Sequence, residues 1–240
     1  MLQCVALDNV ARHFFTIRGV SLKGGVEEVA RGWDMVAREI GVASGNLWRM
    51  TQVHGADVFE VPSVSTTVAA ERPTTDALMT AGRGVALVVQ VADCIPLLLA
   101  DRRTGVVAAT HAGWRGSASR IVARTIEALS RTHGVLPETL VAAVGPSIGP
   151  CCYQVGPDVR EAMLNAYPGA MVAGWFRPDR GDRLKLDMWQ ATSDQLVNAG
   201  VLLENIHIAR LCTATHVAHL HSYRVEGAAA GRMAGVIRAV

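Results

Sequence analysis

Three reactive side chains stand out in this sequence because each interrupts a run of apolar residues. Cys94 lies in the motif ADCIP, and His111 opens the motif HAGWRG seventeen positions later. His54 lies in a third polar segment, TQVHGAD. A polar group in strand-like apolar surroundings is costly unless it is hydrogen-bonded or serves a function. These residues are therefore the first candidates for chemistry.

Cysteine and histidine are the ligands that Zn²⁺ prefers, and a site with three protein ligands leaves a fourth position open. Zinc held by His54, Cys94 and His111 would lower the pKa of a bound water to about 7. Each residue alone is more typical of an inert thiol or a satisfied core histidine. Together, each in a break flanked by glycine or aspartate, they favour a functional site, although no CxxC or HExxH pair is present.

A second interpretation uses the same atoms. Cys94 could act as a nucleophile with His111 as its base, and Asp93 or Asp57 could orient the histidine. Both interpretations need a thiolate beside an imidazole, so both stay open on spacing alone. Asp93, next to Cys94, could transfer a proton or could orient a ligand.

Four arginines lie near glycines in turn-like segments, where a backbone can approach a phosphate and a guanidinium can bind it in a bidentate manner. They are Arg18, Arg115, Arg224 and Arg232. Arg115 is the best candidate because HAGWRG is predicted to start a helix, whose free N–H groups attract anions. Arg232 is more typical of an ordinary surface arginine.

A cluster of histidines and a pair of cysteines are interpreted as residues outside the predicted metal site. His216, His219 and His221 are expected to line the main pocket or to form a pH-sensitive loop rather than a second metal site. Cys151 and Cys152 are expected to pack near the proline-rich loop, since adjacent cysteines form a disulfide with each other poorly.

Periodicity predicts the elements that must position these residues. Helical spacing of apolar residues indicates a helix over Val26–Ile40 and further helices over 117–131, 157–167 and 187–198. Strands are predicted over 46–60, 85–100 (interrupted at Asp93 and Cys94), 106–110, 140–145, 206–209 and 233–240. A hairpin-like turn is expected after 75–80, a surface loop over 63–73 and a mobile polar loop over 174–183. Short strands without regularly alternating helices favour one α/β domain over 1–240 with a mixed sheet.

Composition excludes several classes of protein. The chain has 240 residues, half of them apolar, and a formal net charge of +2. This is typical of a globular protein, and it lacks the clustered Lys and Arg of a nucleic-acid-binding protein. No apolar stretch approaches the roughly 20 residues of a membrane span. Five cysteines without a signal-peptide pattern predict reduced thiols and a cytoplasmic location.

The motifs together resemble the YfiH-type laccase-domain family. QVHG at 52–55, ADCIP, HAGWRG and GPSIG at 145–149 occur in the family's order, followed by CT at 212–213, SYR at 222–224 and GR at 231–232. The resemblance covers nearly the whole chain. It implies a four-layer α/β/β/α domain with mixed sheets and a metal site at His54, Cys94 and His111.

The resemblance also implies an activity. The family was first described as multicopper polyphenol oxidases and later as purine nucleoside enzymes. The later description covers phosphorolysis of adenosine, inosine, guanosine and methylthioadenosine, together with adenosine deamination. The oxidase description fits poorly, because multicopper chemistry needs about ten ligands, mostly paired histidines, and this chain has eight histidines. The segment after Ser21 is shorter than is usual in the family, which could alter specificity.

The leading hypothesis is a purine nucleoside phosphorylase and adenosine deaminase with Zn²⁺, or alternatively copper, as cofactor. Asp93, Cys94 and His111 are the predicted catalytic residues. Nucleoside and phosphate are the predicted partners, without nucleic acid or membrane. The residues predicted to bind substrate are Arg18, Gln52, Arg115, Ser222 and Arg224. The alternatives are a cysteine amidohydrolase that edits peptidoglycan precursors such as a UDP-muramoyl amino acid, and a metal-storing or partner-binding module.

Overall fold

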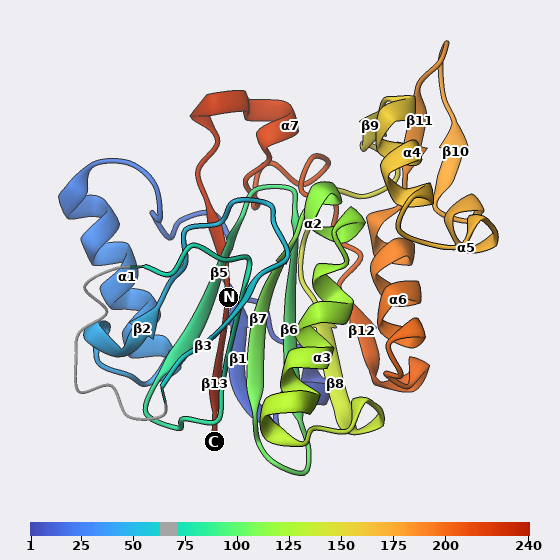
Figure 1. Cartoon of the computed structure of the whole chain (residues 1–240). Coiled ribbons are helices and arrows are strands. Elements are labelled where there is room, and N and C mark those ends of the chain that lie inside the picture. The colour runs from blue at the N-terminus through green and yellow to red at the C-terminus, as the bar shows by residue number, and fades with distance from the viewer. Residues whose placement is uncertain (63–71) are drawn as a thin grey trace.

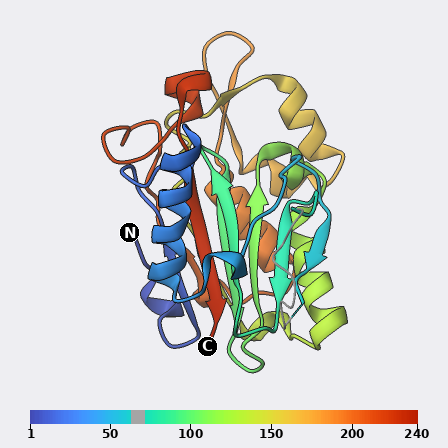
Figure 2. The same ribbon diagram turned by 90° about the vertical axis from the view of Figure 1, so that its left-hand side faces the viewer.

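Two mixed β-sheets pack face to face, and helices cover both outer faces, giving the four layers seen in Figures 1 and 2. The computed structural model describes residues 1–62 and 72–240. The loop predicted over 63–73 therefore lies mostly outside the described residues. The predicted fold class, a single α/β domain with mixed sheets, is confirmed.

The larger sheet contains His111, and Cys94 directly precedes one of its strands. Its strand order is β12-β8-β6-β7-β4-β3, with parallel pairs at both edges and antiparallel pairs between them. The strands are β3 Val58–Glu60, β4 Ala77–Thr80, β6 Ile95–Asp101, β7 Val107–Ala112, β8 Leu140–Val144 and β12 Ile206–Ile208. The β6–β7 register places Pro96 opposite His111, so the start of β6 meets the end of β7.

The smaller sheet closes the other side of the central core. Its order is β1-β13-β5-β2, antiparallel except for the β2–β5 pair. Its strands are β1 Ala11–Phe15, β2 Leu47–Trp48, β5 Ala86–Val91 and β13 Met233–Ala239. A third sheet, β10-β11-β9, projects at the upper right of Figure 1 and is made of β9 Gln154–Val155, β10 Phe176–Pro178 and β11 Leu184–Leu186.

Side chains that point alternately to the two faces of the buried strands contribute to three separate apolar cores. In β5, Leu87 and Val89 face the space between the sheets, whereas Ala86 and Val88 face α1. Because successive side chains of a strand point to opposite faces, strands covered on both sides are apolar throughout. This explains the uninterrupted apolar runs of β5 and β6.

The helices cover the outer faces. In chain order they are α1 Val26–Ile40, α2 Trp114–Ala118, α3 Ile121–His133, α4 Pro157–Leu164, α5 Gly169–Ala173, α6 Met188–Asn198 and α7 Tyr223–Glu226. Helix α1 has the predicted bounds, and Gly41 ends it with a φ of 80°, a left-handed conformation that glycine adopts at little cost. Asp187 caps α6 by accepting the N–H of Gln190, as predicted.

Four local predictions are wrong, three of them because strand pairing between distant segments overrides the local pattern. Residues 46–60 form two short strands, β2 and β3, in different sheets, with His54 in the connection. Strands β4 and β5 also belong to different sheets and form no hairpin. Arg120, with a φ of 66°, splits the helix predicted over 117–131 into α2 and α3. The segment 174–183 contributes β10 to an antiparallel pair with β11 rather than forming an irregular loop.

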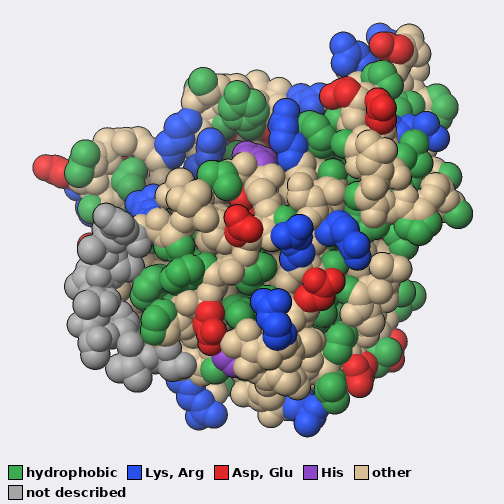
Figure 3. All heavy atoms as spheres, viewed as in Figure 1, with side chains coloured by type: hydrophobic (Ala, Val, Ile, Leu, Met, Phe, Trp, Pro, Cys, Tyr) green, Lys and Arg blue, Asp and Glu red, His purple; other side chains and the backbone are tan. Residues whose placement is uncertain are grey.

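None of the helices in the described part of the chain is both long and apolar enough to cross a membrane. On the face shown in Figure 3, acidic and basic side chains are interspersed rather than separated into large patches of one sign.

Candidate active site

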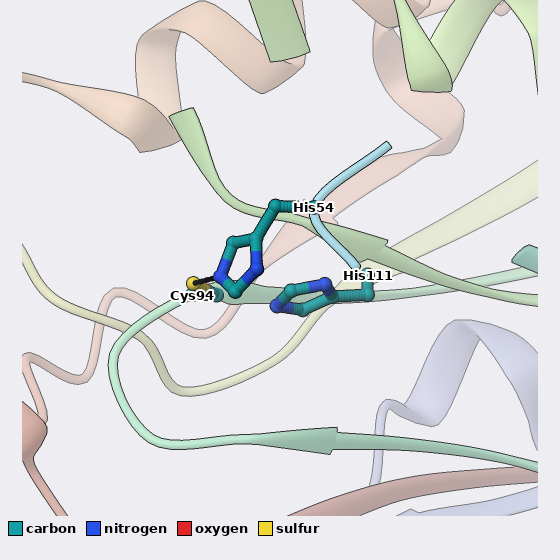
Figure 4. A group of neighbouring side chains, drawn as sticks. All are labelled: His54, Cys94 and His111. Atoms are coloured by element: carbon teal, nitrogen blue, oxygen red, sulfur yellow. Dashed lines mark hydrogen bonds between the residues drawn. The ribbon is translucent and has the colours of Figure 1, made fainter. Parts of the chain in front are cut away.

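His54, Cys94 and His111 converge at one end of the larger sheet (Figure 4). Cys94 directly precedes β6, His111 lies in β7, and His54 comes from the connection between β2 and β3. One ligand atom from each lies within 4.8 Å of the others, and Cys94 Sγ is 3.9 Å from His54 Nε2. The structure thus brings together three residues that span 58 positions of the sequence.

Asp76, for which the sequence motifs predicted no role, holds this group together. Its side chain is fully buried and accepts hydrogen bonds from the backbone N–H groups of Val53, His54 and Gly55 at 3.1, 3.0 and 2.7 Å. It also lies 2.7 Å from Nδ1 of His111. The sequence indicates Asp76 only as an acidic residue that directly precedes a buried strand. Asp76 therefore positions two of the three candidate ligands.

The contact with Asp76 determines which nitrogen of His111 faces the group. Burial raises the pKa of Asp76, but the hydrogen bond from His111 and those from backbone N–H groups outweigh it, so the pKa is lowered. An ionised carboxylate only accepts hydrogen bonds. Nδ1 of His111 therefore carries a proton and donates a hydrogen bond to Asp76. Nε2 is left for a ligand, as in the carboxylate–histidine–metal arrangement.

Backbone conformation brings the ligands close. His54 and Asp93 are non-glycine residues with left-handed φ values of 59° and 88°, a conformation that is concentrated at functional sites. A Cβ atom on Gly113 would come within 3.0 Å of both Cys94 Sγ and His54 Cδ2. Glycine at 113 therefore leaves room for these two side chains, which a larger residue would push apart.

The donor set fits zinc. One sulfur and two imidazole nitrogens are typical zinc ligands, and three protein ligands leave a coordination position for water or substrate. The preoriented Nε2 of His111 and the space opened by Gly113 are the features of this structure that support the assignment. Copper also accepts imidazole and thiolate ligands, so the donor set alone does not select zinc over copper.

Cys94 and His111, the two most buried members of the group, shift each other's pKa. Burial raises the pKa of Cys94, but hydrogen bonds and positive charge from His111 and His54 outweigh it and lower the pKa to about 6. Burial lowers the pKa of His111, but Asp76 and the Cys94 thiolate raise it to about 9. Without metal, the pair is therefore a thiolate and an imidazolium at neutral pH, and a metal ion would displace the Nε2 proton.

We expect metal-free protein to react with iodoacetamide at Cys94 with a half-maximal rate near pH 6, because the thiolate is the reacting form. The ordinary value is about 8.5. Peptide mass mapping across pH measures this, with Cys4, whose pKa is raised by burial, as an internal control. Zinc should slow the reaction at Cys94 at least roughly tenfold by occupying its sulfur. An ordinary thiol profile at Cys94 would contradict the contact with the two histidines.

The same geometry corrects one detail of the nucleophile interpretation. The acid that hydrogen-bonds to His111 is Asp76, not Asp93 or Asp57. Both oxygens of Asp93 accept other hydrogen bonds, from Thr213 Oγ1 at 2.5 Å and from the backbone N–H of Arg224 at 2.6 Å. Asp93 therefore connects the loop before β6 to the segment that carries α7.

The candidate ligands lie in a cavity of about 600 Å³, a size typical of small-molecule sites. Its walls include the aromatic rings of Trp114, Tyr153 and Tyr223, which offer flat apolar surfaces. The two tyrosines were not selected from the sequence, although Tyr223 lies inside the SYR motif. An opening lined by aromatic rings suits a planar ligand.

Three of the four candidate arginines also line the cavity: Arg115, Arg224 and Arg232. The guanidinium of Arg115 lies 4.3 Å from the centre of the Trp114 ring, and that of Arg224 lies 5.5 Å from the Tyr153 ring. Arg115 follows Trp114 at the start of α2, as predicted. Arg232, interpreted from the sequence as a surface residue, is half-buried in the cavity wall.

The remaining residues predicted to bind substrate are engaged elsewhere. Arg18 is outside the cavity lining and pairs with Glu226 at 2.8 Å. Gln52 lines the cavity, but its amide group donates to and accepts from the backbone of Gln90, both at 2.8 Å. Ser222 is fully buried behind α7, and its N–H donates to Glu226. Their contacts are those of residues that position the cavity wall.

The predicted pocket-lining role of the C-terminal histidines is not what the structure shows. His216, His219 and His221 are absent from the cavity lining within the described residues. Nδ1 of His216 lies 2.9 Å from the carbonyl oxygen of Cys212, and His221 is half-buried beside Glu226 and Gly231. They belong to the loop that connects β12 to α7.

Comparison with known proteins identifies the family. Residues 18–239 match the family described as multi-copper polyphenol oxidoreductase laccase. A purine nucleoside phosphorylase from Deinococcus radiodurans is 38% identical over 212 residues, 87% of this chain and 76% of that protein. Another from Bacteroides thetaiotaomicron is 35% identical over 66% of this chain, and the match spans 58% of that longer protein.

Solved structures give the same result. The YlmD protein of Geobacillus stearothermophilus has a TM-score of 0.88 at 26% identity, with 98% of this chain and 94% of that chain covered. A hypothetical protein YfiH of Bacillus licheniformis has a TM-score of 0.88 at 25% identity, with 97% and 94% covered. The chain belongs to the multi-copper polyphenol oxidoreductase laccase family, and the resemblance inferred from its motifs is confirmed.

Proposed function

We propose that this protein is a zinc-dependent purine nucleoside phosphorylase that acts on adenosine, inosine, guanosine and methylthioadenosine. The observation that carries the proposal is a cavity with candidate metal ligands, aromatic walls and arginines around one space. Relatives named purine nucleoside phosphorylase, matched over most of this chain, support it. Such relatives are enzymes, as was predicted for this chain.

The cavity provides separate surfaces for the two substrates. The rings of Trp114, Tyr153 and Tyr223 would stack against the purine base. The guanidinium groups of Arg115, Arg224 and Arg232 would bind the phosphate and hold it beside the ribose. Phosphate bound there would attack C1′ of the ribose through one oxygen while the bond from C1′ to N9 breaks. The purine leaves with the bonding electrons and takes up a proton, and the other product is ribose 1-phosphate.

His54, Cys94 and His111 are the residues that would hold the metal. When bound, zinc supplies a Lewis acid at the base of the cavity. Asp76 would keep Nδ1 of His111 protonated, so that Nε2 stays available as a ligand. Copper is the alternative ion, although the family's oxidase description has little support here. Only two of the eight histidines, His54 and His111, belong to a group of candidate ligands in the described part of the chain.

Asp93 favours phosphorolysis over deamination as the main reaction. Deamination of adenosine by water at C6 needs an acid that exchanges protons with the purine and the leaving ammonia. Asp93 is the adjacent acid, but Thr213 and Arg224 each donate a hydrogen bond to one of its oxygens. These contacts suit a residue that positions the Arg224 segment. We therefore assign Asp93 a positioning role and deamination a minor one.

One observation favours the alternative of a cysteine amidohydrolase. Cys94, His111 and Asp76 are connected in the order nucleophile, base and orienting acid. The metal is preferred because a second imidazole, that of His54, also approaches the sulfur at 3.9 Å, which a nucleophile–base pair does not require.

Five free cysteines suit a reducing compartment such as the cytoplasm.

Incubation of the purified protein with adenosine and phosphate tests the proposal. Chromatography should show adenine and ribose 1-phosphate in equal amounts, with inosine as a minor product. No release of adenine from adenosine, and no release of purine from inosine or guanosine, would refute it. Cleavage of a UDP-muramoyl amino acid at an amide bond by the same preparation would establish the amidohydrolase instead.

Substitution Arg115→Ala should raise the KM for phosphate by roughly ten- to a hundredfold, because a charge-assisted contact to the anion is lost. The KM for inosine should change less than threefold. Initial rates at varied phosphate and varied inosine separate the two effects. Arg31→Ala, on the exposed face of α1, is the control with the same loss of charge. An unchanged KM for phosphate would remove Arg115 from the phosphate site.

A further inference from the structure

A second group of metal-ligating atoms lies outside the ligands described above. The sulfur atoms of Cys151, Cys152 and Cys212 lie within 4.8 Å of one another. Two of these cysteines follow Pro150 in the loop after β8, and the third follows β12 sixty-one residues after Cys151. All three are free thiols. Cys151 and Cys152 were expected to pack near the proline-rich loop and Cys212 was noted only in the CT motif, but the fold brings all three together.

The backbone around the cluster is built so that the two segments meet. Ser147 and Cys212 form a parallel bridge, and the N–H of Thr213 donates to the carbonyl oxygen of Ser147 at 3.1 Å. The N–H of Gly149 donates to Cys212 Sγ at 3.2 Å. A Cβ on residue 149 would come within 2.6 Å of Trp189 and 3.2 Å of the Cys212 Cβ. Glycine at 149 therefore permits the close approach of this loop to Trp189 and Cys212.

We propose that Cys151, Cys152 and Cys212 form a second metal site, which binds one thiophilic divalent cation of the Zn²⁺ class through three thiolates. Zinc–sulfur bonds of about 2.3 Å in tetrahedral geometry place sulfurs roughly 3.8 Å apart. The cluster therefore has to contract by no more than about 1 Å to bind an ion. The fourth position is left for water or a small ligand.

Charge favours a divalent ion over a monovalent one. Three thiolates leave a net charge of −1 with a divalent ion and −2 with a monovalent one. The smaller residual charge costs less to hold among partly buried thiols.

The exposures of the three thiols suit the entry of an ion from solvent. Cys151 is exposed, Cys152 is half-buried and Cys212 is only 3% exposed. The buried sulfur of Cys212 thus forms the inner end of the site, and the exposed sulfur of Cys151 lies at its solvent side.

The site adjoins the cavity without sharing a ligand with it. Cys152 precedes Tyr153, a wall of the cavity, and Cys212 precedes Thr213, which hydrogen-bonds to Asp93. An ion that joins the two segments would fix Tyr153 and the Asp93 contact in place. The second site therefore has a structural role beside the active site.

Cadmium titration of the reduced full-length protein tests the proposal, because cadmium–thiolate bonds absorb in the ultraviolet. In Cys94→Ala, which lacks the sulfur ligand of the first site, one Cd²⁺ per chain should bind with the absorbance of three thiolates. Adding Cys151→Ser, at an exposed position, should remove about a third of this absorbance and weaken binding at least roughly tenfold. Adding Cys4→Ser, a half-buried cysteine in another part of the fold, should change neither value.

Two outcomes would overturn the proposal. One is the absence of stoichiometric Cd²⁺ binding in reduced Cys94→Ala. The other is absorbance and affinity that are equal in the Cys151→Ser and Cys4→Ser backgrounds. Because Cys151 is exposed, its replacement by serine leaves the fold intact, and circular dichroism of each variant verifies this.

Discussion

Replacement of Cys94 by alanine is expected to reduce phosphorolysis of inosine by at least about 10³-fold, the scale on which loss of a central catalytic group lowers kcat. The substitution removes the one sulfur among the three candidate ligands and leaves His54 and His111 to hold the metal alone. Zinc bound at this site should fall in parallel. Steady-state rates and the zinc content of the purified variant measure both effects.

Cys4→Ala is the matched control, because Cys4 is also a half-buried free thiol but packs against the core between the sheets, away from the site. It should retain full activity and the zinc of the active site. Activity of Cys94→Ala within threefold of the wild type would contradict the assignment of this cysteine to the site.

Asp76→Asn should weaken zinc binding by roughly ten- to a hundredfold, the usual effect of losing a carboxylate that orients a histidine ligand. Asp76 accepts from four donors, the three backbone N–H groups and Nδ1 of His111. Asparagine has only one acceptor oxygen, so its NH₂ group would face at least one of these donors and could not bind it. We also expect the free energy of unfolding to fall by about 2–4 kcal/mol, since a buried charge-assisted network is broken. Competition with a chromophoric chelator and urea denaturation measure the two effects.

The loss of stability at Asp76 should depend on pH. The pKa of this carboxylate is lowered in the folded protein, so its contribution is fully present above the unfolded value of about 3.9. It disappears as the pH falls through the lower folded value. Asp57→Asn, an exposed aspartate on the same connection, is the control and should change zinc affinity less than twofold. Equal effects of the two substitutions would show that Asp76 does not position the ligands.

Local patterns predicted those parts of the fold that depend on local packing. The apolar face of α1 and the glycine at 41 gave its bounds, because both signals lie within the helix. The break between β5 and β6 at Asp93 and Cys94 was also predicted, because two polar residues interrupt otherwise apolar strands. In such segments, burial and periodicity point to the same structure.

What depends on contacts between distant segments was not predicted. Asp76 and His111 are 35 positions apart and meet through the β4–β7 pairing, which no local pattern indicates. The thiols of Cys152 and Cys212 meet through a bridge between two loops. His54 was placed in a polar segment inside or at the end of a predicted strand, but the three N–H groups that bind Asp76 belong to an irregular connection.

The roles of the arginines show the same limit. Arg18 and Arg224 both lie near glycines or in turn-like segments, and both were predicted to bind substrate. The fold turns Arg18 toward Glu226 and places Arg224 over Tyr153 in the cavity. Residue type identified candidates for anion binding, and only the three-dimensional arrangement separated the cavity arginines from a structural ion pair.

Removal and restoration of metal test the central claim most directly. Protein depleted of metal by a chelator and dialysed should lose at least about 99% of its inosine phosphorolysis activity, and added Zn²⁺ should restore it, as expected for a Lewis acid within the catalytic site. Hypoxanthine release under saturating phosphate is the readout, and metal content is measured on the same samples. Full activity in metal-depleted protein, or no purine release before or after zinc is restored, would contradict the account.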